Sequence, residues 1–185
     1  EDPITKAITS TRLFETKLDR IGIPRQFGKM ALTLDDAIDC TIWEEFAEFP
    51  DLVFPMYPHQ FSAATEFIEG IGINGYGGII QAKCGSGKTV TALGVASLLK
   101  VPTLILVHKS DLMNQWLGLT DAQAPDGKGY GIRKFLGLSD DKIGWVRQDT
   151  QVFEDKPITV ALFQTVRARR EELEAKGFFD RFSLV

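Results

Sequence analysis

A run of small residues that ends in a lysine and a hydroxyl residue is the part of this sequence best suited to chemistry. Small residues let the backbone curl so that several N–H groups converge on phosphate oxygens. A lysine placed after them can reach the β- and γ-phosphates, and the hydroxyl can supply a ligand to Mg²⁺. We therefore predict a site for a nucleoside triphosphate and Mg²⁺ at Ala82-Lys83-Cys84-Gly85-Ser86-Gly87-Lys88-Thr89, with Lys88 on the phosphates and Thr89 on the metal.

Two elements must position this loop, namely a strand before it and a helix after it. The short apolar run Gly78 to Ala82 predicts the strand, and residues 88–100 predict the helix. Cys84 is interpreted as a small filler within the loop, with a redox role as the alternative. Residues 70–75 match the pattern G-x-G-x-x-G, but they follow a helix and open none, so a dinucleotide site is not expected there.

The rest of the chain alternates between helical patterns and short apolar runs, which is typical of an α/β fold. Runs that predict strands lie at residues 103–107, 143–146 and 158–163, and residues 182–185 look like the beginning of one more. Helices are expected at residues 61–68 and 167–176, and a third is expected to begin at Ser110, which would be its N-cap. A glycine-rich connection is expected at residues 70–78 and a loop at residues 119–131. This alternation predicts a mostly parallel sheet with helices on both faces.

Composition places the chain among ordinary soluble proteins. Its 185 residues fit one domain, or one domain with a small extension. No stretch reaches the roughly 20 apolar residues of a membrane-spanning helix, and the acidic start at Glu1 and Asp2 is unlike a signal peptide. Two cysteines, Cys40 and Cys84, give no disulfide framework and no zinc spacing. We expect a protein of the cytoplasm or nucleus that is neither secreted nor bound to a membrane.

Charge divides the chain into two regions and limits how it could bind nucleic acid. Residues 1–51 carry 11 acids and 6 bases, and residues 52–185 carry 14 acids and 15 bases. With a net charge of −4, any contact with nucleic acid must be local. Prolines cluster from Pro50 to Pro58, so we predict an accessory segment at residues 1–52, mixed or helical with a helix near 11–21, and the nucleotide-binding domain at residues 53–185.

Three further segments, together with the loop, carry a resemblance to a known family. They read Met56-Tyr57-Pro58-His59-Gln60, Thr103-Leu104-Ile105-Leu106-Val107-His108-Lys109-Ser110 and Ile158-Thr159-Val160-Ala161-Leu162-Phe163-Gln164-Thr165. Their order around the loop resembles the first, RecA-like motor domain of superfamily 2 helicases and translocases. The branch with transcription-and-repair helicases and related phage and large-virus helicases is the most similar. The resemblance covers about residues 55–185, and residues 1–50 resemble no family.

The resemblance implies roles for particular residues. Gln60 would recognise adenine, because a side-chain amide offers one donor and one acceptor to the N6 and N7 edge; a structural capping role is the alternative. His108, Lys109 and Ser110 would hold a nucleic-acid backbone, with a surface or core histidine as the alternative for His108. Gln164 and Thr165 would also hold that backbone. The nearby basic residues are either a solvated helix face or part of the nucleic-acid path: Arg167, Arg169 and Arg170.

The next motif of that family is an apolar strand that ends in Asp-Glu-x-His, which anchors Mg²⁺ and polarises water. Residues 182–185 resemble the entry to that strand, and the sequence stops there. We therefore expect the N-terminal part of a longer ATP-dependent motor, with a second RecA-like domain in the same longer chain and no obligate oligomer. By itself this part is expected to bind nucleotide weakly at most and to show no DNA-stimulated turnover.

Three functions remain open at this point. The first is an ATP-dependent helicase or translocase, for which DNA is the expected partner and RNA stays possible. The second is the motor subunit of a restriction system. The third is a regulatory module that binds nucleotide and changes shape without moving along nucleic acid.

Overall fold

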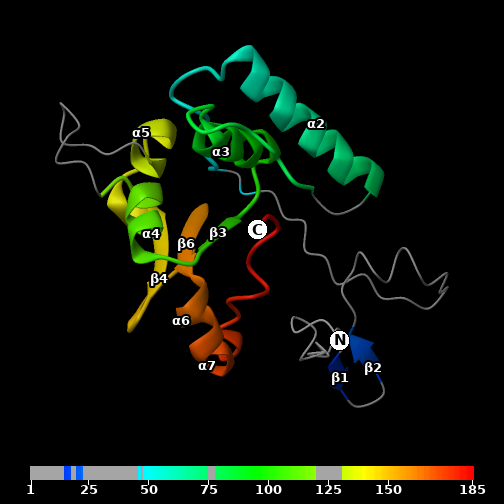
Figure 1. The fold of residues 1–185 in the computed structure, drawn as a ribbon. Coiled ribbons are helices and arrows are strands. Elements are labelled where there is room, and N and C mark those ends of the chain that lie inside the picture. The colour runs from blue at the N-terminus through cyan, green and yellow to red at the C-terminus, as the bar shows by residue number, and fades with distance from the viewer. Residues whose placement is uncertain (1–14, 18–19, 23–45, 47, 75–77, 120–130) are drawn as a thin grey trace, which may run out of the picture. The chain divides into compact units, whose positions relative to one another are not determined.

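The computed structural model describes residues 15–17, 20–22, 46, 48–74, 78–119 and 131–185 (Figure 1). The chain forms two compact units, residues 1–39 and residues 40–185. The expected division of the chain after residue 52 stays a prediction. Within the described residues, no helix has both the length and the apolar character needed to cross a membrane.

In the first unit the described residues form a small antiparallel ladder. Strand β1 (Glu15–Lys17) pairs with β2 (Arg20–Gly22), with Thr16 opposite Ile21. The helix expected near residues 11–21 is therefore wrong for the residues described. Thr16 and Ile21 are β-branched, and such residues favour strands over helices. The other residues of that expected helix lie outside the described part of the chain.

The second unit contains a four-stranded sheet in the order β3-β6-β4-β5. Its strands are β3 (Thr103–Val107), β4 (Ile143–Arg147), β5 (Thr150–Val152) and β6 (Ile158–Leu162). Strand β6 is parallel to both β3 and β4, and β5 returns antiparallel to β4. All five residues of β6 are buried, as expected for a continuous apolar run inside a parallel sheet. The mostly parallel sheet is confirmed, and β5 is an addition to the expected strands.

Two apolar cores cover the two faces of this sheet. On one face α3 (Lys88–Leu99), α4 (Ser110–Leu117) and α5 (Ile132–Leu136) pack against the strands, as with Leu93, Met113 and Val160. On the other face lie α6 (Phe163–Ala168), α7 (Arg170–Ala175) and Phe178. The longest helix, α2 (Pro58–Asn74), packs on α3, and the short 3-10 helix η1 (Asp140–Lys142) leads into β4. Figure 1 shows this layered arrangement.

Several element boundaries differ from the sequence-based expectation. Helix α2 runs through Gly70 and Gly72 to Asn74, well past the expected end at residue 68. The expected helix at 167–176 is two helices that begin at Phe163, directly after β6. Ser110 is the first residue of α4, and its N-cap is Lys109.

The largest difference concerns residues 78–82, which were expected to form the strand before the loop. They are not in a strand, and Ile79 is 96% exposed. An apolar run becomes a strand only where a neighbouring strand can bond its N–H and C=O groups. The C-terminal residues form no strand either, but Leu184 makes an isolated parallel bridge with Thr103, and the strand expected to begin at residues 182–185 stays a prediction.

Candidate functional site

The loop before α3 is held in a tight curl by two glycines. Gly85 and Gly87 have φ angles of 78° and 80°, in the left-handed region that glycine adopts without steric cost. Between them, Ser86 donates from its backbone N–H to the Lys83 carbonyl at 3.3 Å and from its hydroxyl to the same oxygen at 2.8 Å. These contacts close a turn over residues 83–86, in which Cys84 is exposed.

Helix α3 begins directly after this turn without a side-chain cap. Its N-cap is Gly87, so no side chain bonds the first N–H groups of the helix, which have no acceptor inside it. The Lys88 ammonium folds onto the loop and donates to the carbonyls of Ala82 at 3.2 Å and Lys83 at 2.9 Å. Thr89, in the first turn, is half-buried. Uncapped N–H groups, a positive helix end and an ammonium group thus meet in one place, which suits a polyphosphate.

Gln60 ties the loop to helix α2. This side chain is 4% exposed, and its amide uses both of its ends. Nε2 donates to the Ser86 carbonyl at 3.0 Å, and Oε1 accepts from the Tyr57 N–H at 2.9 Å. A Cβ placed on Gly87 would lie 2.2 Å from Nε2, so the two residues fit only because Gly87 has no side chain. The structure thus gives Gln60 the capping role named as the alternative, and adenine recognition stays a prediction.

His59 adds a second contact to the same carbonyl. Its Nε2 lies 3.3 Å from the Ser86 oxygen, and its ring stacks on Tyr57 with centroids 6.0 Å apart. Both rings are exposed at the start of α2. The residues before and inside α2 therefore form one side of the loop's surroundings.

The residues expected to hold nucleic acid lie at the carboxyl ends of β3 and β6. Those strands are parallel neighbours, so the turns that follow them meet at one edge of the sheet. The Gln164 amide donates to the His108 carbonyl at 2.6 Å, which joins the two turns directly. His108 and Lys109 are exposed, and Ser110 is half-buried. The structure therefore brings these predicted residues together, although their contact with nucleic acid stays a prediction.

The Thr165 side chain bonds to the turn that follows a third strand, β4. It is 9% exposed, and its hydroxyl accepts a hydrogen bond from the Gln148 N–H at 3.2 Å. Gln148 follows β4 and has a φ of 50°, so this bond holds a turn that adopts an unusual backbone conformation. Gln164 and Thr165 thus connect the ends of β3, β6 and β4. Nothing in the sequence signalled Gln148, because its role depends on the backbone of a short turn.

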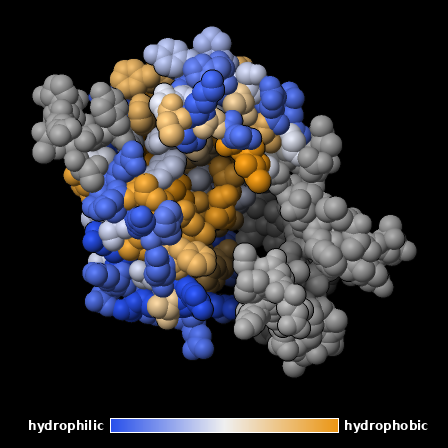
Figure 2. Space-filling view, in the orientation of Figure 1, coloured by the Kyte–Doolittle hydropathy of each residue, from blue (hydrophilic) through white to orange (hydrophobic). Residues whose placement is uncertain are grey.

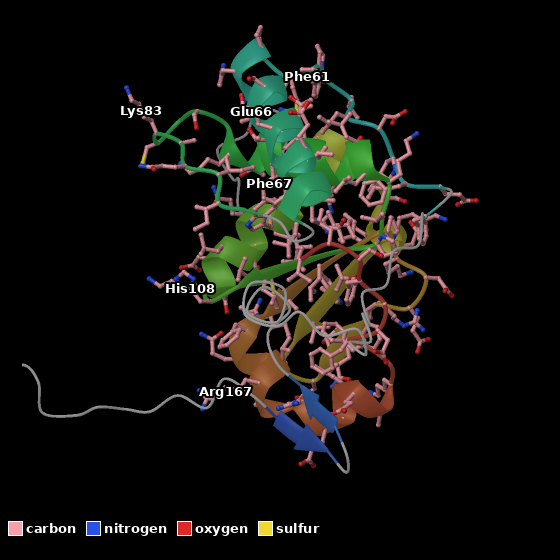
Figure 3. All side chains as sticks on the ribbon, turned by 90° about the vertical axis from the view of Figure 1, so that its right-hand side faces the viewer. Phe61, Glu66, Phe67, Lys83, His108 and Arg167 are labelled. Carbon is pink, nitrogen blue, oxygen red and sulfur yellow. The ribbon has the colours of Figure 1, made fainter. Side chains whose placement is uncertain are left out.

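The loop and the strand ends face the same side of the second unit. In Figure 3 the side chains of Lys83, His108 and Arg167 all extend toward one side, although they come from the loop, β3 and α6. In open α/β sheets ligands bind beyond the carboxyl ends of the strands. The predicted site residues therefore lie on one side of the second unit, from the phosphate loop to α6.

Comparison with known proteins assigns this arrangement to a family. Residues 53–185 match the family described as "Type III restriction enzyme, res subunit". The chain belongs to this family. The matched region includes the loop, Gln60 and both turns at the strand ends.

Relatives of this res-subunit family member are helicases and translocases. It is 34% identical over 95 residues to "Putative ATP-dependent RNA helicase L396" of Acanthamoeba polyphaga mimivirus, which covers 51% of the chain and 18% of that relative. It is 34% identical over 99 residues to "DNA 3'-5' translocase XPB2" of Sulfurisphaera tokodaii. That match covers 54% of the chain and 19% of the relative. It is 53% identical over 38 residues to "Putative helicase 109L" of Invertebrate iridescent virus 3. That match covers 20% of the chain and 12% of the relative.

These relationships identify the first motor domain of a superfamily 2 helicase. The α/β sheet with helices on both faces agrees with that assignment. The matched stretches span at most about a fifth of the relatives' own length.

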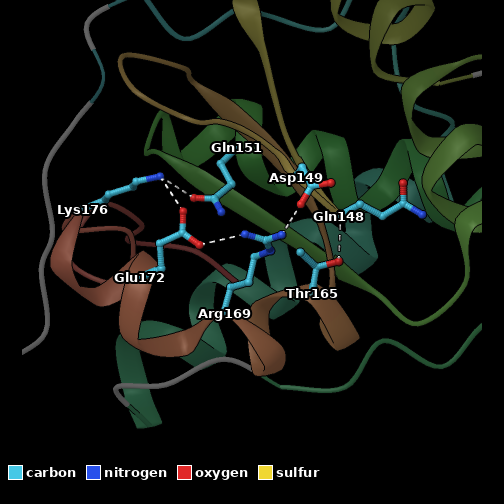
Figure 4. Close-up of polar contacts among 7 residues, drawn as sticks. All are labelled: Gln148, Asp149, Gln151, Thr165, Arg169, Glu172 and Lys176. Carbon is cyan, nitrogen blue, oxygen red and sulfur yellow. Dashed lines mark hydrogen bonds and ion pairs between the residues drawn. The ribbon is translucent and has the colours of Figure 1, made fainter.

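One member of the basic group is engaged within the res-subunit fold. Arg169 pairs with Asp149 and donates to Glu172 at 2.9 Å, and Lys176 donates to Glu172 at 2.9 Å and to Gln151 at 2.8 Å (Figure 4). The network fastens α7 to the turn between β4 and β5. For Arg169 it favours a structural role, while Arg167 and Arg170 are exposed.

The same network shifts two pKa values. Hydrogen bonds from Lys176, Arg169 and Gln151 lower the pKa of the Glu172 carboxyl to about 2. The pKa of the Arg169 guanidinium is raised, chiefly by its hydrogen bond to Glu172. Neither group lies in the phosphate loop. Among the described residues, no cluster of three or more His, Cys, Asp or Glu side chains could hold a metal ion.

Proposed function

We propose that this domain binds ATP with Mg²⁺ at residues 83–89 and serves as the first lobe of an ATP-dependent helicase or translocase. The observation that carries the proposal is the loop itself. Two left-handed glycines, an uncapped helix start and the Lys88 ammonium converge where a triphosphate would lie. The relatives named as helicases and a translocase support the same function.

The loop's own residues divide the binding between them. The N–H groups at the start of α3 would donate hydrogen bonds to the phosphate oxygens, and Lys88 would exchange its bonds to loop carbonyls for bonds to phosphate. Thr89 would offer its hydroxyl to Mg²⁺, which would neutralise phosphate charge when bound. Gln60 would hold Ser86 in place and keep one amide hydrogen for the adenine edge.

We further propose that the turns at residues 108–110 and 164–165 hold the backbone of a nucleic acid, with DNA as the expected partner. N–H groups, hydroxyls and a lysine at such turns can contact phosphates without reading sequence. Two exposed basic residues, Lys109 and Arg167, add local positive charge to a chain with a net charge of −4. A few local positive charges suit the binding of a partner that must be released and bound again.

In this proposal the domain works as part of a longer protein. A second RecA-like lobe would close on the nucleotide, and hydrolysis would open the lobes again, so that the grip moves along a strand. The chain covers less than a fifth of the length of its two more extensively matched relatives, which leaves room for such a lobe in proteins of this type.

The first experiment removes the ammonium group. Charge-assisted hydrogen bonds contribute roughly 1.5–3 kcal/mol each, so Lys88→Ala should weaken binding of a fluorescent ATP analogue about 10- to 100-fold. Lys142→Ala, which removes an exposed lysine paired with Glu48 at 3.8 Å, is the matched control and should leave the affinity unchanged. Equal affinities for Lys88→Ala and the parent chain would reject the phosphate-binding role.

The second experiment concerns turnover. We expect this chain alone to show no DNA-stimulated ATP hydrolysis, because it contains no Asp-Glu-x-His sequence to polarise water. ATP hydrolysis that disappears in Lys88→Ala would contradict that expectation and would indicate another source of the missing carboxylates.

The family description favours one second candidate, the motor subunit of a restriction system. The same ATP-driven movement would then serve a nuclease or methylase partner. If DNA stimulates ATP hydrolysis by the full-length protein, the protein is one of the two motors and not a regulatory nucleotide switch. Nuclease or methylase activity in the full-length protein or its complex would separate the restriction motor from the helicase.

A further inference from the structure

Helix α6 has a buried face and an outward face. Thr165 and Val166 are buried, each with 9% exposure. Phe163, Gln164 and Arg167 are exposed. Residues four positions apart in a helix lie next to each other on one face, so Phe163 and Arg167 are neighbours. The outward face of α6 therefore presents an aromatic ring, an amide and a guanidinium.

Phe163 is exposed although it directly follows a fully buried strand. All five residues of β6 are buried, and Phe163 is 52% exposed. A single exposed apolar residue is common on protein surfaces, so exposure alone assigns no function. The function of this ring is indicated by the residues around it.

The turn after β3 lies next to this outward face. The Gln164 amide donates to the His108 carbonyl at 2.6 Å, so His108 and Lys109, which are both exposed, follow β3 beside the start of α6. Figure 3 shows the side chains of His108 and Arg167 extending toward the same side. The Phe163 ring is therefore accompanied by an amide, a lysine and an arginine. Proteins that hold single-stranded nucleic acid combine these features, because cations and amides contact phosphates while aromatic rings stack on bases.

The positive charge at this place is small for a site that would hold a polyanion. Residues 108–111 and 163–167 contain two bases, Lys109 and Arg167, and one acid, Asp111. The whole chain has a net charge of −4, and binding through phosphates alone depends on positive charge. A stacked base adds binding that does not depend on charge, because every base has a π-face.

We propose that Phe163 stacks on an unpaired base, so that this domain prefers a single strand with accessible bases. The inference rests on the proposed function, in which residues 108–110 and 164–165 hold the backbone, and it adds a contact to a base. Stacking accepts any base, so the preference concerns strandedness and not sequence. In a duplex the neighbouring bases cover each other's faces, so Phe163 would reach a base only at an end or in an unpaired segment.

The surroundings of α6 favour a nucleic acid over a protein as the occupant. Docking sites for proteins are typically contiguous apolar patches. In Figure 2 the lower part of the second unit, where α6 and α7 lie in Figure 1, is mostly hydrophilic. An isolated aromatic ring with Lys109 and Arg167 nearby suits a base flanked by phosphates better than it suits an apolar protein surface.

The test compares two fluorescein-labelled single strands of about 12 nucleotides, an oligothymidylate and a strand of abasic sites. Both carry the same number of phosphates, so they differ in their bases alone. Binding is measured by fluorescence anisotropy at low salt, where contacts to phosphates are strongest. We expect the parent chain to bind the oligothymidylate about tenfold more tightly than the abasic strand.

Variants of the ring and of its neighbours separate the two kinds of contact. Phe163→Ala should remove the preference for the oligothymidylate, and so should Phe163→Leu, which keeps an apolar side chain without a π-face. Phe163→Trp should retain the preference. Lys109→Ala should weaken the binding of both strands by the same factor, because it removes a phosphate contact. Phe179→Ala removes a ring of similar exposure, 44%, and is the matched control that should change neither affinity.

The outcomes distinguish this inference from the proposed function. Equal affinities of the parent chain for the two strands would overturn the stacking role and leave the proposed backbone contact intact. A preference that survives in Phe163→Ala would do the same. If neither strand binds, with or without the ATP analogue, the proposed nucleic-acid contact itself is rejected, and the inference with it. Self-association of the parent chain that Phe163→Ala abolishes would instead assign the ring to an interface between two copies.

Discussion

The second unit contains two regions that are stabilised in different ways. The sheet half consists of β3 to β6 with α4 to α7, and every residue of its central strand β6 is buried. The loop half consists of α2, residues 78–87 and α3, and residues 78–79 and 81–85 are exposed. The sheet half is held by apolar packing on two faces, while the loop is held by a few hydrogen bonds and two glycine backbones.

This difference explains which half can serve as a scaffold and which as a binding element. Apolar cores resist local change because every side chain contacts many others. A loop held by the Ser86 carbonyl and the Lys83 carbonyl can exchange those bonds for bonds to a ligand at little cost. Substitutions should therefore affect global stability in the sheet half and loop geometry in the loop half.

The largest expected effect is on the stability of the sheet half. Phe178 is fully buried and packs edge-on against Phe153 and Phe182, with centroids 5.0 Å from each. Phe178→Ala should lower the free energy of unfolding by about 3–5 kcal/mol, measured by urea denaturation. The neighbouring Phe179 is 44% exposed, and Phe179→Ala is the control with a much smaller loss. Similar losses for the two variants would mean that the aromatic cluster is not the core of this face.

The next effect tests the loop half through its two glycines. Ala at a left-handed position costs roughly 1–2 kcal/mol, and both Gly85 and Gly87 are left-handed. A Cβ at Gly85 meets nothing within 4 Å, whereas one at Gly87 meets the Gln60 amide at 2.2 Å. Gly87→Ala should therefore weaken ATP-analogue binding more than Gly85→Ala, measured by fluorescence titration.

A double variant isolates the cause of that difference. With Gln60→Ala in place the clash is removed, so Gly87→Ala should then cost about as much as Gly85→Ala. An unchanged gap between the two glycine variants in the Gln60→Ala background would show that Gln60 does not set the loop geometry.

A smaller effect is expected where the sheet half meets the site. Gln164→Ala removes a neutral hydrogen bond to the His108 carbonyl from an exposed side chain, which should cost about 0.5–1.5 kcal/mol. Amide exchange at Lys109 and Ser110 should become faster, because the turn loses its connection to α6. Gln115→Ala, at an exposed position of α4, should leave those amides unchanged. Equal amide exchange rates in the two variants would mean that Gln164 does not stabilise this turn.

The sequence predicted the sheet half better than the loop half. Residues 103–107 are a strand as expected, and β4 and β6 differ from expectation by one residue each. These strands were predictable because a fully buried strand is a continuous apolar run. Residues 78–82 contain two isoleucines but form no strand, since pairing depends on a neighbour that local sequence does not contain. Helix α2 was predicted too short because Gly70 and Gly72 resembled a connection, although helices tolerate glycine at a cost of about 1 kcal/mol.

For the site, residue types were predictable and their mutual contacts were not. The spacing of Gly85, Gly87 and Lys88 was sufficient to predict a curled loop at the start of a helix. The bonds of Gln60 to Ser86 and of Gln164 to His108 join residues far apart in the chain, so they depend on tertiary packing. The pairing of Arg169 with Asp149 likewise needed the turn between β4 and β5, which the sequence pattern did not indicate.

The smallest expected effect concerns acid stability at that turn. The pKa of Glu172 is lowered to about 2 from 4.5, so the folded state favours the charged carboxylate. Its contribution to stability is present above pH 4.5 and is lost as the pH falls toward 2. Glu172→Gln should therefore flatten the pH dependence of the free energy of unfolding over this range, measured by urea denaturation at each pH.

Lys176→Met should raise the Glu172 pKa toward its usual value, seen by NMR titration, because it removes the strongest of the hydrogen bonds that lower it. A Glu172 pKa that stays near 2 in Lys176→Met would assign the shift to the hydrogen bonds from Arg169 and Gln151.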